Sequence, residues 1–89
     1  MMSEVIIITG SRKGIGRYLS EYYSNIGMSV IGCSRTQSDY SHQNYEHYCV
    51  DVTQEEAVIS MISSIYKKYK KIDLFMNKNV GFINRLFFN

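Results

Sequence analysis

Four short apolar runs alternate with longer segments that are either helical in their periodicity or plainly polar. The first run, Val5–Ile8, consists of four consecutive β-branched residues, which is typical of a strand buried on both faces inside a parallel sheet. Three further runs predict strands at Ser29–Ser34, His47–Val50 and Ile72–Met76. The polar and aperiodic stretch Thr36–Tyr45 predicts a connection with room for one turn of helix.

Apolar residues spaced three and four positions apart predict a first helix directly after the first strand. Its expected buried face consists of Ile15, Leu19, Tyr22 and Ile26. Gly27 follows at the position where a left-handed residue commonly ends a helix, so we expect the helix to stop there.

A start signal and a second apolar face predict the second helix. Thr53 and Glu56 have the spacing of a capping box, with Thr53 as the N-cap. The residues expected on the buried face of this helix are Val58, Met61, Ile62, Ile65 and Tyr69. Because strands and helical segments alternate along the chain, right-handed crossovers and an α/β fold with a parallel sheet are predicted.

Length and composition describe one small folded domain. The chain has 89 residues, of which 45% are hydrophobic and 20% charged. Its net charge of +2 is too small to favour a nucleic acid or an anionic membrane as a partner. The apolar runs are too short for a transmembrane helix and the first residues lack a secretory leader, so we expect a cytoplasmic protein.

Cysteine and histidine residues do not predict a cross-link or a metal site. Cys33 and Cys49 fall near the ends of the second and third predicted strands, and we expect both to be buried free thiols in a reducing compartment. His42 and His47 have no third ligand at metal-binding spacing, so no metal site is predicted.

The most specific pattern is the glycine-rich turn that joins the first strand to the first helix, Thr9–Gly16, with the sequence T-G-S-R-K-G-I-G. Gly10 permits a sharp turn off the strand, Gly14 lets the backbone approach a diphosphate, and Gly16 lets the helix pack closely on the sheet. The start of the helix then offers unpaired N–H groups to phosphate. A glycine-rich turn in an unrelated α/β domain is the alternative interpretation.

This turn resembles that of the short-chain dehydrogenase/reductase family, which carries T-G-x-x-x-G-x-G at this place. The resemblance continues with Ser34–Arg35 after the second strand and with Asp51–Thr53 after the third. The family has N-N-A-G after its fourth strand, whereas Asn77–Gly81 reads N-K-N-V-G, with one residue extra. The resemblance covers about residues 4–81 and leaves 82–89 as an unassigned tail.

The resemblance implies a Rossmann-like sheet with strand order 3-2-1-4, helices on both faces, and a single dinucleotide-binding domain present in truncated form over residues 1–89. It also implies that Asp51 and Val52 contact the adenine ring. The alternative for Asp51 is that it only begins the turn before the second helix, and the two roles are compatible. The cofactor-binding residues implied by the resemblance are Thr9, Gly10, Ser11, Arg12, Lys13, Gly14, Ile15, Gly16, Ser34, Arg35, Asp51, Val52, Asn79 and Gly81.

The charge at the end of the second strand predicts the choice of cofactor. A site that prefers NAD usually places an acid there to bind the ribose 2′-hydroxyl, but this chain has Arg35, and Asp39 comes too late. The guanidinium of Arg35 suits a 2′-phosphate, and Arg12 and Lys13 add positive charge. The sequence therefore predicts NADP, with NAD less favoured. The alternative is that Arg35 is a solvated loop residue.

The resemblance also implies which catalytic groups to look for. The family's serine and Tyr-x-x-x-Lys pair lie downstream of the last residue here, and Tyr66 and Lys70 have this spacing only by coincidence, on the second helix. No catalytic residue is predicted. The chain resembles the cofactor-binding N-terminal half of an NADP-dependent oxidoreductase acting on an alcohol or carbonyl. The alternative is a non-catalytic remnant, truncated or frameshifted, or a weak nucleotide-binding module.

One expectation concerns association between copies. In the order 3-2-1-4, the strand Ile72–Met76 lies at the edge of the sheet with only Asp73 as a charged residue. Open edges of this kind pair with other chains, so we expect self-association through the fourth strand.

Overall fold

The central strand of the sheet is β1 (Val5–Thr9), and all five of its residues are buried. In the computed structural model, which describes residues 4–77 and 81–83, β1 pairs in parallel with β2 (Ser29–Ser34) and with β4 (Leu74–Asn77). β2 also pairs in parallel with β3 (Tyr45–Cys49). These four parallel strands have the predicted order 3-2-1-4.

Two strands begin two residues away from their predicted starts. β3 begins at Tyr45 rather than at His47, and β4 begins at Leu74 rather than at Ile72. Before β4, the carboxylate of Asp73 accepts a hydrogen bond from the Val5 N–H at 2.8 Å, and the Asp73 N–H donates to the Val5 carbonyl oxygen at 2.9 Å. Residues 35–44 connect β2 to β3 as a loop without a helical turn.

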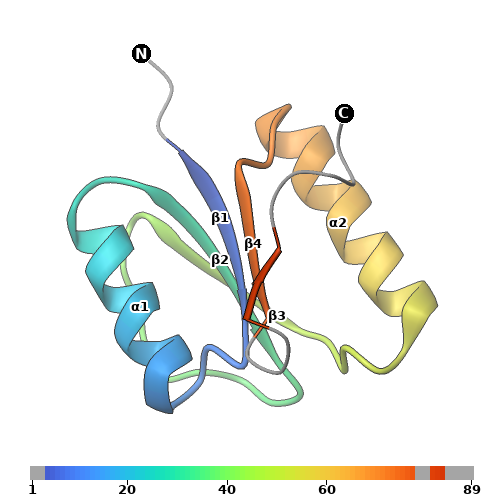
Figure 1. The fold of residues 1–89 in the computed structure, drawn as a ribbon, viewed down its shortest axis with the longest axis horizontal. Helices are drawn as coiled ribbons and strands as arrows, with labels where there is room; N and C mark the ends of the chain where they lie inside the picture. The colour runs from blue at the N-terminus through green and yellow to red at the C-terminus, as the bar shows by residue number, and fades with distance from the viewer. Residues whose placement is uncertain (1–3, 78–80, 84–89) are drawn as a thin grey trace.

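Helices α1 (Gly14–Asn25) and α2 (Glu55–Tyr69) cover opposite faces of the sheet (Figure 1). The alternation of side chains along β1 divides the core accordingly. Toward α2, Val5 and Ile7 join a cluster whose other buried members are Ile31, Cys33, Met61, Ile65, Ile72 and Phe75. Toward α1, the buried residues are Ile6, Ile8 and Val30. The predicted Rossmann-like α/β fold with helices on both faces is confirmed.

The predicted buried face of α1 is correct at Leu19, which is partly buried and packs against the sheet, and wrong at its other three residues. Ile15 is 78% exposed, and Tyr22 and Ile26 are exposed as well. The residues of α1 that are buried are small: Gly16, Ser20 and Ser24. Small residues bring the helix close to the sheet, and a Cβ on Gly16 would collide with the carbonyl oxygen of Gly10. The predicted end of the helix is correct, because Gly27 follows it with a φ of +98°.

The predicted buried face of α2 is correct in its centre, but the predicted capping box does not form. Met61 and Ile65 are buried against the sheet. The N-cap of α2 is Gln54, not Thr53, and it makes no side-chain cap hydrogen bond. The hydroxyl of Thr53 instead donates to the carboxylate of Asp51 at 2.7 Å, which removes it from the helix start.

A fifth strand corrects the expectation of an open edge at the fourth strand. β5 (Gly81–Ile83) pairs antiparallel with β4, with Phe82 opposite Met76. The sheet order within the described residues is therefore β3-β2-β1-β4-β5, and β4 has a neighbour on both sides. This removes the reason given for self-association through the fourth strand, although association itself is not tested by the structure.

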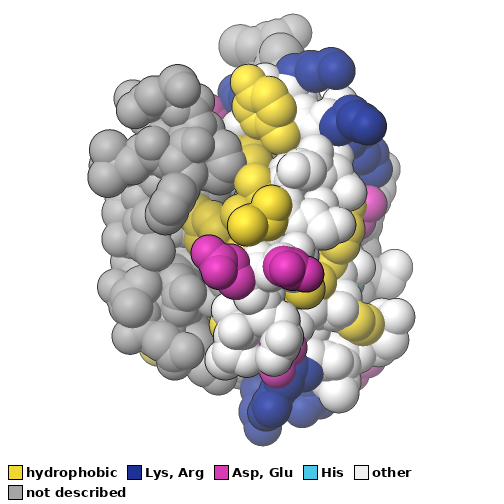
Figure 2. All heavy atoms as spheres, turned by 90° about the vertical axis from the view of Figure 1, so that its right-hand side faces the viewer, with side chains coloured by type: hydrophobic (Ala, Val, Ile, Leu, Met, Phe, Trp, Pro, Cys, Tyr) yellow, Lys and Arg dark blue, Asp and Glu magenta, His cyan; other side chains and the backbone are white. Residues whose placement is uncertain are grey.

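Charge on α2 follows the helix dipole. Glu55 and Glu56 lie in its first turn, and Lys67 and Lys68 lie in its last turn. Figure 2 views the molecule from the α2 side. It shows basic side chains at the upper and lower ends of the molecule, with acidic side chains between them. Across residues 4–77 and 81–83, no helix has the length and apolar character needed to cross a membrane.

Candidate functional site

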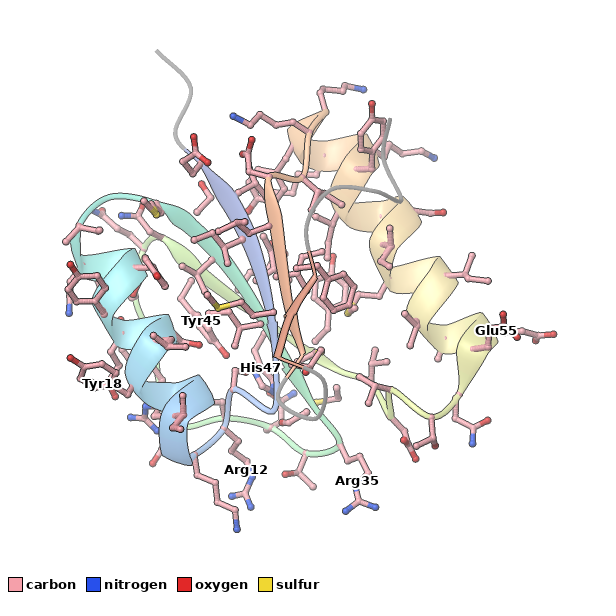
Figure 3. All side chains as sticks on the ribbon, in the orientation of Figure 1. Arg12, Tyr18, Arg35, Tyr45, His47 and Glu55 are labelled. Carbon is pink, nitrogen blue, oxygen red and sulfur yellow. The ribbon has the colours of Figure 1, made fainter. Side chains whose placement is uncertain are left out.

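A cleft of about 600 Å³ opens at the carboxyl ends of β1, β2 and β3. This is the edge at which open parallel sheets bind ligands. Figure 3 shows Arg12 and Arg35 projecting from this edge of the molecule. The residues that line the cleft are Thr9, Gly10, Arg12, Lys13, Cys33, Ser34, Arg35, Thr36, Val50, Asp51, Val52 and Thr53.

The structure brings together most of the predicted site residues. Those that line the cleft are Thr9, Gly10, Arg12, Lys13, Ser34, Arg35, Asp51 and Val52. Those that form the glycine-rich turn and the start of α1 without lining the cleft are Ser11, Gly14, Ile15 and Gly16. Gly81 lies in β5 opposite Asn77, and Asn79 lies outside the described residues.

The glycine-rich turn is held against the end of β2. The N–H of Gly10 donates to the carbonyl oxygen of Cys33 at 2.8 Å, and Gly10 and Gly14 have φ values of +65° and +67°. Lys13 is the N-cap of α1 but makes no side-chain cap hydrogen bond, and the first turn has no acidic residue. The N–H groups at the start of α1 are therefore available to an anion.

Positive charge without a paired carboxylate surrounds the cleft. Arg12, Lys13 and Arg35 are exposed. Among the described residues, none of the three belongs to an ion pair. Asp39, the acid nearest in sequence to the end of β2, pairs with Arg17 at 2.7 Å instead of facing the cleft as a free acid. The site thus combines a helix start with three cationic side chains, an arrangement suited to phosphate groups.

Asp51 both shapes the loop after β3 and lines the cleft. Its Oδ1 accepts hydrogen bonds from the N–H of Thr53 at 2.9 Å and from the Thr53 hydroxyl at 2.7 Å. These two bonds, together with the positive charge of Arg35, lower the pKa of Asp51 below its ordinary value. The carboxylate is therefore ionised near neutral pH and can accept hydrogen bonds from a ligand.

A polar network behind the cleft was not predicted from the sequence. The hydroxyl of Ser11 lies 2.9 Å from Tyr45 Oη, which in turn lies 2.7 Å from His47 Nδ1. A Cβ on Gly32 would collide with both hydroxyl groups, so the glycine in β2 makes room for this contact. The available signal was the pair of polar aromatic residues two positions apart on a strand, because such residues share one face of the sheet.

The remaining candidates add no reactive group to this site. Both cysteines are free; Cys33 is buried as expected, but Cys49 is exposed at the end of the outer strand β3. Burial raises the pKa of the Cys33 thiol to about 11, so it is unreactive near neutral pH. Tyr66 and Lys70 are exposed at the end of α2 and do not line the cleft. No group of three metal-binding side chains occurs in the described part of the chain.

Comparisons with known proteins agree with the motifs. The model of the short chain dehydrogenase family matches residues 4–89. The NADPH-dependent pterin aldehyde reductase of Arabidopsis thaliana is 32% identical over 91 residues, a match that covers 93% of this chain and 37% of that protein. The first curated relatives are matched over 34% to 37% of their own length, so the chain spans about a third of them.

Solved structures share the fold. The ligand-free aldohexose dehydrogenase of Thermoplasma acidophilum has a TM-score of 0.80 and 32% identity, over 86% of this chain and 29% of that one. ElxO with NADP bound has a TM-score of 0.77 and 31% identity, over 86% of this chain and 35% of that one. Because the family model covers nearly the whole sequence and the motif residues meet at one cleft, this chain belongs to the short chain dehydrogenase family of oxidoreductases.

Proposed function

We propose that this chain is the NADP-binding part of an oxidoreductase that interconverts alcohol and carbonyl groups. The observation that carries the proposal is the set of three cations at the cleft, Arg12, Lys13 and Arg35, none of which forms an ion pair among the described residues. A site for NAD usually has an acid at the end of the second strand, where this chain has Ser34 and Arg35.

The division of roles follows from the chemistry of each group. The start of α1 and the open space in front of Gly14, where a Cβ would meet no atom within 4 Å, suit the diphosphate. The fork of N–H donors on Arg35 suits a 2′-phosphate, and the ionised Asp51 can accept a hydrogen bond from the adenine amino group. The nicotinamide of such a cofactor supplies the hydride when bound, whereas these residues bind and orient its adenosine half.

Two relatives support NADP over NAD. The pterin aldehyde reductase at 32% identity is NADPH-dependent, and ElxO at 31% identity has been solved with NADP bound. The residues described here are assigned to the adenosine half of the cofactor, and they do not identify a substrate. We therefore propose the cofactor and the class of reaction, and leave the substrate unnamed.

A second candidate is a nucleotide-binding module that does not catalyse hydride transfer. The observation that favours it is the composition of the cleft, which has no tyrosine among its lining residues in the described part of the chain. An assay of NADPH oxidation with simple carbonyl substrates tests this candidate, because turnover by this chain would exclude it. Turnover that is lost in Tyr66→Phe and Lys70→Ala variants would show that this pair on α2 is catalytic after all.

Calorimetric titration with NADP⁺ and NAD⁺ tests the proposed cofactor. A charge-assisted contact with the 2′-phosphate contributes about 1.5–3 kcal/mol, so we expect roughly ten- to hundredfold tighter binding of NADP⁺. Arg35→Ala should remove this preference, while Lys67→Ala, which deletes an exposed charge at the far end of α2, should keep it. Equal binding of the two cofactors by the unchanged chain would contradict the proposal.

A further inference from the structure

A chain of hydrogen bonds connects the glycine-rich turn to the turn that carries Arg35. Ser11 Oγ lies 2.9 Å from Tyr45 Oη, which lies 2.7 Å from His47 Nδ1. On the other side of the imidazole, Nε2 lies 3.0 Å from the carbonyl oxygen of Thr36. Figure 3 shows Tyr45 and His47 inward of the edge at which Arg35 projects. Two ligand-binding turns are thus joined through side chains of β3.

The direction of each hydrogen bond between Ser11 and Thr36 follows from the acceptor at the Thr36 end. His47 Nε2 lies 3.0 Å from the Thr36 carbonyl oxygen, which can only accept, and 3.0 Å from the Ser34 hydroxyl. The hydrogen of that hydroxyl is donated to the Thr36 carbonyl, so His47 Nε2 carries a hydrogen of its own and Nδ1 of the neutral ring is an acceptor. Tyr45 must then donate to Nδ1, and Ser11 must donate to Tyr45 Oη. Burial raises the pKa of Tyr45, which keeps its hydroxyl protonated and able to donate.

The Thr36 carbonyl closes the turn that carries Arg35. It accepts a hydrogen bond from the Ser34 hydroxyl at 2.6 Å as well as the bond from His47 Nε2. Arg35, between these two residues, is exposed, and its side chain forms no ion pair among the described residues. The backbone on either side is therefore what fixes the direction in which its guanidinium leaves the sheet.

The sequence makes specific room for this arrangement. Gly32, in β2, lies opposite His47 in β3, and a Cβ there would collide with Tyr45 Oη and with Ser11 Oγ. Ser11 is fully buried, so its hydroxyl needs the partner that Tyr45 provides. Consecutive hydrogen bonds in one direction also strengthen one another.

We propose that His47 is a positioning residue for cofactor selectivity: its Nε2–H holds the Ser34–Thr36 turn so that Arg35 faces the 2′-phosphate of NADP. This proposal rests on the proposed function, because it requires that Arg35 reads the 2′-phosphate. It goes beyond that function by assigning selectivity to a residue that does not line the cleft.

Two substitutions of His47 distinguish the role of its Nε2 donor from that of its Nδ1 acceptor. In His47→Gln the side-chain amide reaches the Nε2 position and keeps a donor for the Thr36 carbonyl. In His47→Asn the amide ends at the Nδ1 position, so it keeps an acceptor for Tyr45 but has no donor for Thr36. Both variants remain polar and neutral, which makes each the control for the other.

The ligands for the test are adenosine 2′,5′-bisphosphate and adenosine 5′-monophosphate, which differ only in the 2′-phosphate. The measured quantity is the ratio of their dissociation constants by calorimetry. We expect His47→Asn to reduce the preference for the bisphosphate about three- to tenfold while changing monophosphate affinity by less than about twofold. His47→Gln should keep the preference within about twofold of the unchanged chain.

Three results would overturn the proposal, and they are distinguishable. An unchanged preference in His47→Asn would show that the turn holds Arg35 without His47, with the proposed function intact. Loss of preference in both variants would show that the Nε2 donor is not the feature that matters. Absence of any preference in the unchanged chain would contradict the proposed NADP function and, with it, the selectivity role.

The tautomer of His47 tests the assignment without any substitution or ligand, and so covers the case in which a variant does not fold. Imidazole nitrogen NMR shifts of the ¹⁵N-labelled chain distinguish the two neutral forms. The assignment requires the Nε2–H form above the pH at which the ring is protonated. A neutral ring with its hydrogen on Nδ1 would reverse the hydrogen-bond chain and overturn the proposal.

Discussion

The fully buried residues of α2 are long and apolar, whereas the fully buried residues of α1 are glycine and serine. On the α2 side, Met61 and Ile65 are buried together with Ile72 and Phe75. On the α1 side, the buried helix residues are Gly16, Ser20 and Ser24, and the apolar side chains that the helix adds, Leu19 and Tyr23, are only partly buried. On one face of the sheet α2 buries large apolar side chains, and on the other face α1 lies close to the strands.

The difference follows from the position of the cleft. The start of α1 has to lie beside Gly10 at the carboxyl edge, and the contact between Gly16 and the Gly10 carbonyl leaves no room for a side chain. α2 begins after the cleft residue Thr53 and runs away from it, so nothing limits the size of its buried residues. We infer that α2 supplies most of the stability from apolar burial and that α1 supplies the geometry of the site.

The largest effect expected from this comparison is that of truncating an isoleucine on α2. Ile65→Ala should lower the free energy of unfolding by about 3 kcal/mol, because it removes a fully buried side chain and leaves a cavity. Ile15→Ala is the matched control on α1, where the isoleucine is 78% exposed, and should change stability by less than about 0.5 kcal/mol. Urea unfolding measures both, and equal losses would contradict the assignment of the two faces.

A substitution at Gly16, the first buried residue of α1, tests the close approach of this helix to the sheet. Gly16→Ala should lower the free energy of unfolding by about 2 kcal/mol, because the new Cβ meets backbone atoms of Gly10 that cannot turn aside as a side chain would. Since the same shift moves the start of α1, nucleotide binding should weaken as well. A Gly16→Ala protein with unchanged stability and unchanged nucleotide affinity would show that this contact does not hold the helix.

The two helices also show which parts of the structure are readable from sequence. Apolar periodicity identified the buried face of α2, where Ile65 is 0% exposed, because that interface is made of large side chains. On α1 the same reasoning was correct for Leu19 but wrong for Ile15 and Tyr22, which recur at helical spacing and are exposed. Periodicity records hydrophobicity, whereas α1 is held by the small size of its inward residues.

The candidate site divides in a similar way. The glycine-rich turn, Arg35 and Asp51 were predictable because each follows directly from its place at the end of a strand. The contact between Ser11 and Tyr45 was not, because it joins residues 34 positions apart across two strands. β5 was not predictable either, since three residues carry too little pattern to identify a strand.

A pH dependence of stability should arise on the α2 side from Cys33. Its thiol has a pKa of about 11 in the folded chain against an ordinary value of 9.0, because burial disfavours the thiolate. Between pH 8 and 10 the unfolded chain releases this proton and the folded chain keeps it, so stability falls as pH rises, by about 1.4 kcal/mol at pH 10.

Unfolding curves of the unchanged chain and of Cys33→Ala across this pH range measure the effect. The tyrosines whose pKa values burial also raises, Tyr45, Tyr48 and Tyr69, are common to both proteins, so the difference in slope reports the thiol together with its electrostatic effect on Tyr45. Parallel slopes would show that the Cys33 thiol does not titrate as a buried group.

The smallest expected change in stability is the difference between substitutions of the two buried serines of α1. The hydroxyl of Ser24 donates to the Ser20 carbonyl oxygen and lies 2.6 Å from Tyr40 Oη, which ties the loop between β2 and β3 to the helix. Within residues 4–77 and 81–83, the hydroxyl of Ser20 bonds only to the Gly16 carbonyl oxygen of its own helix, at 2.7 Å. Ser24→Ala should therefore lower the free energy of unfolding by about 1 kcal/mol, because Tyr40 loses its partner. Ser20→Ala should change it by less than about 0.5 kcal/mol, since alanine has the higher helix propensity and no other group loses a bond. Urea unfolding of the two single variants makes the comparison, with Tyr40→Phe as the control that removes the same bond from its other end. If Ser20→Ala cost as much as Ser24→Ala, the hydrogen bond to Tyr40 would contribute nothing to stability, and the loop that begins with Arg35 would be held to α1 by other contacts, such as the ion pair between Arg17 and Asp39.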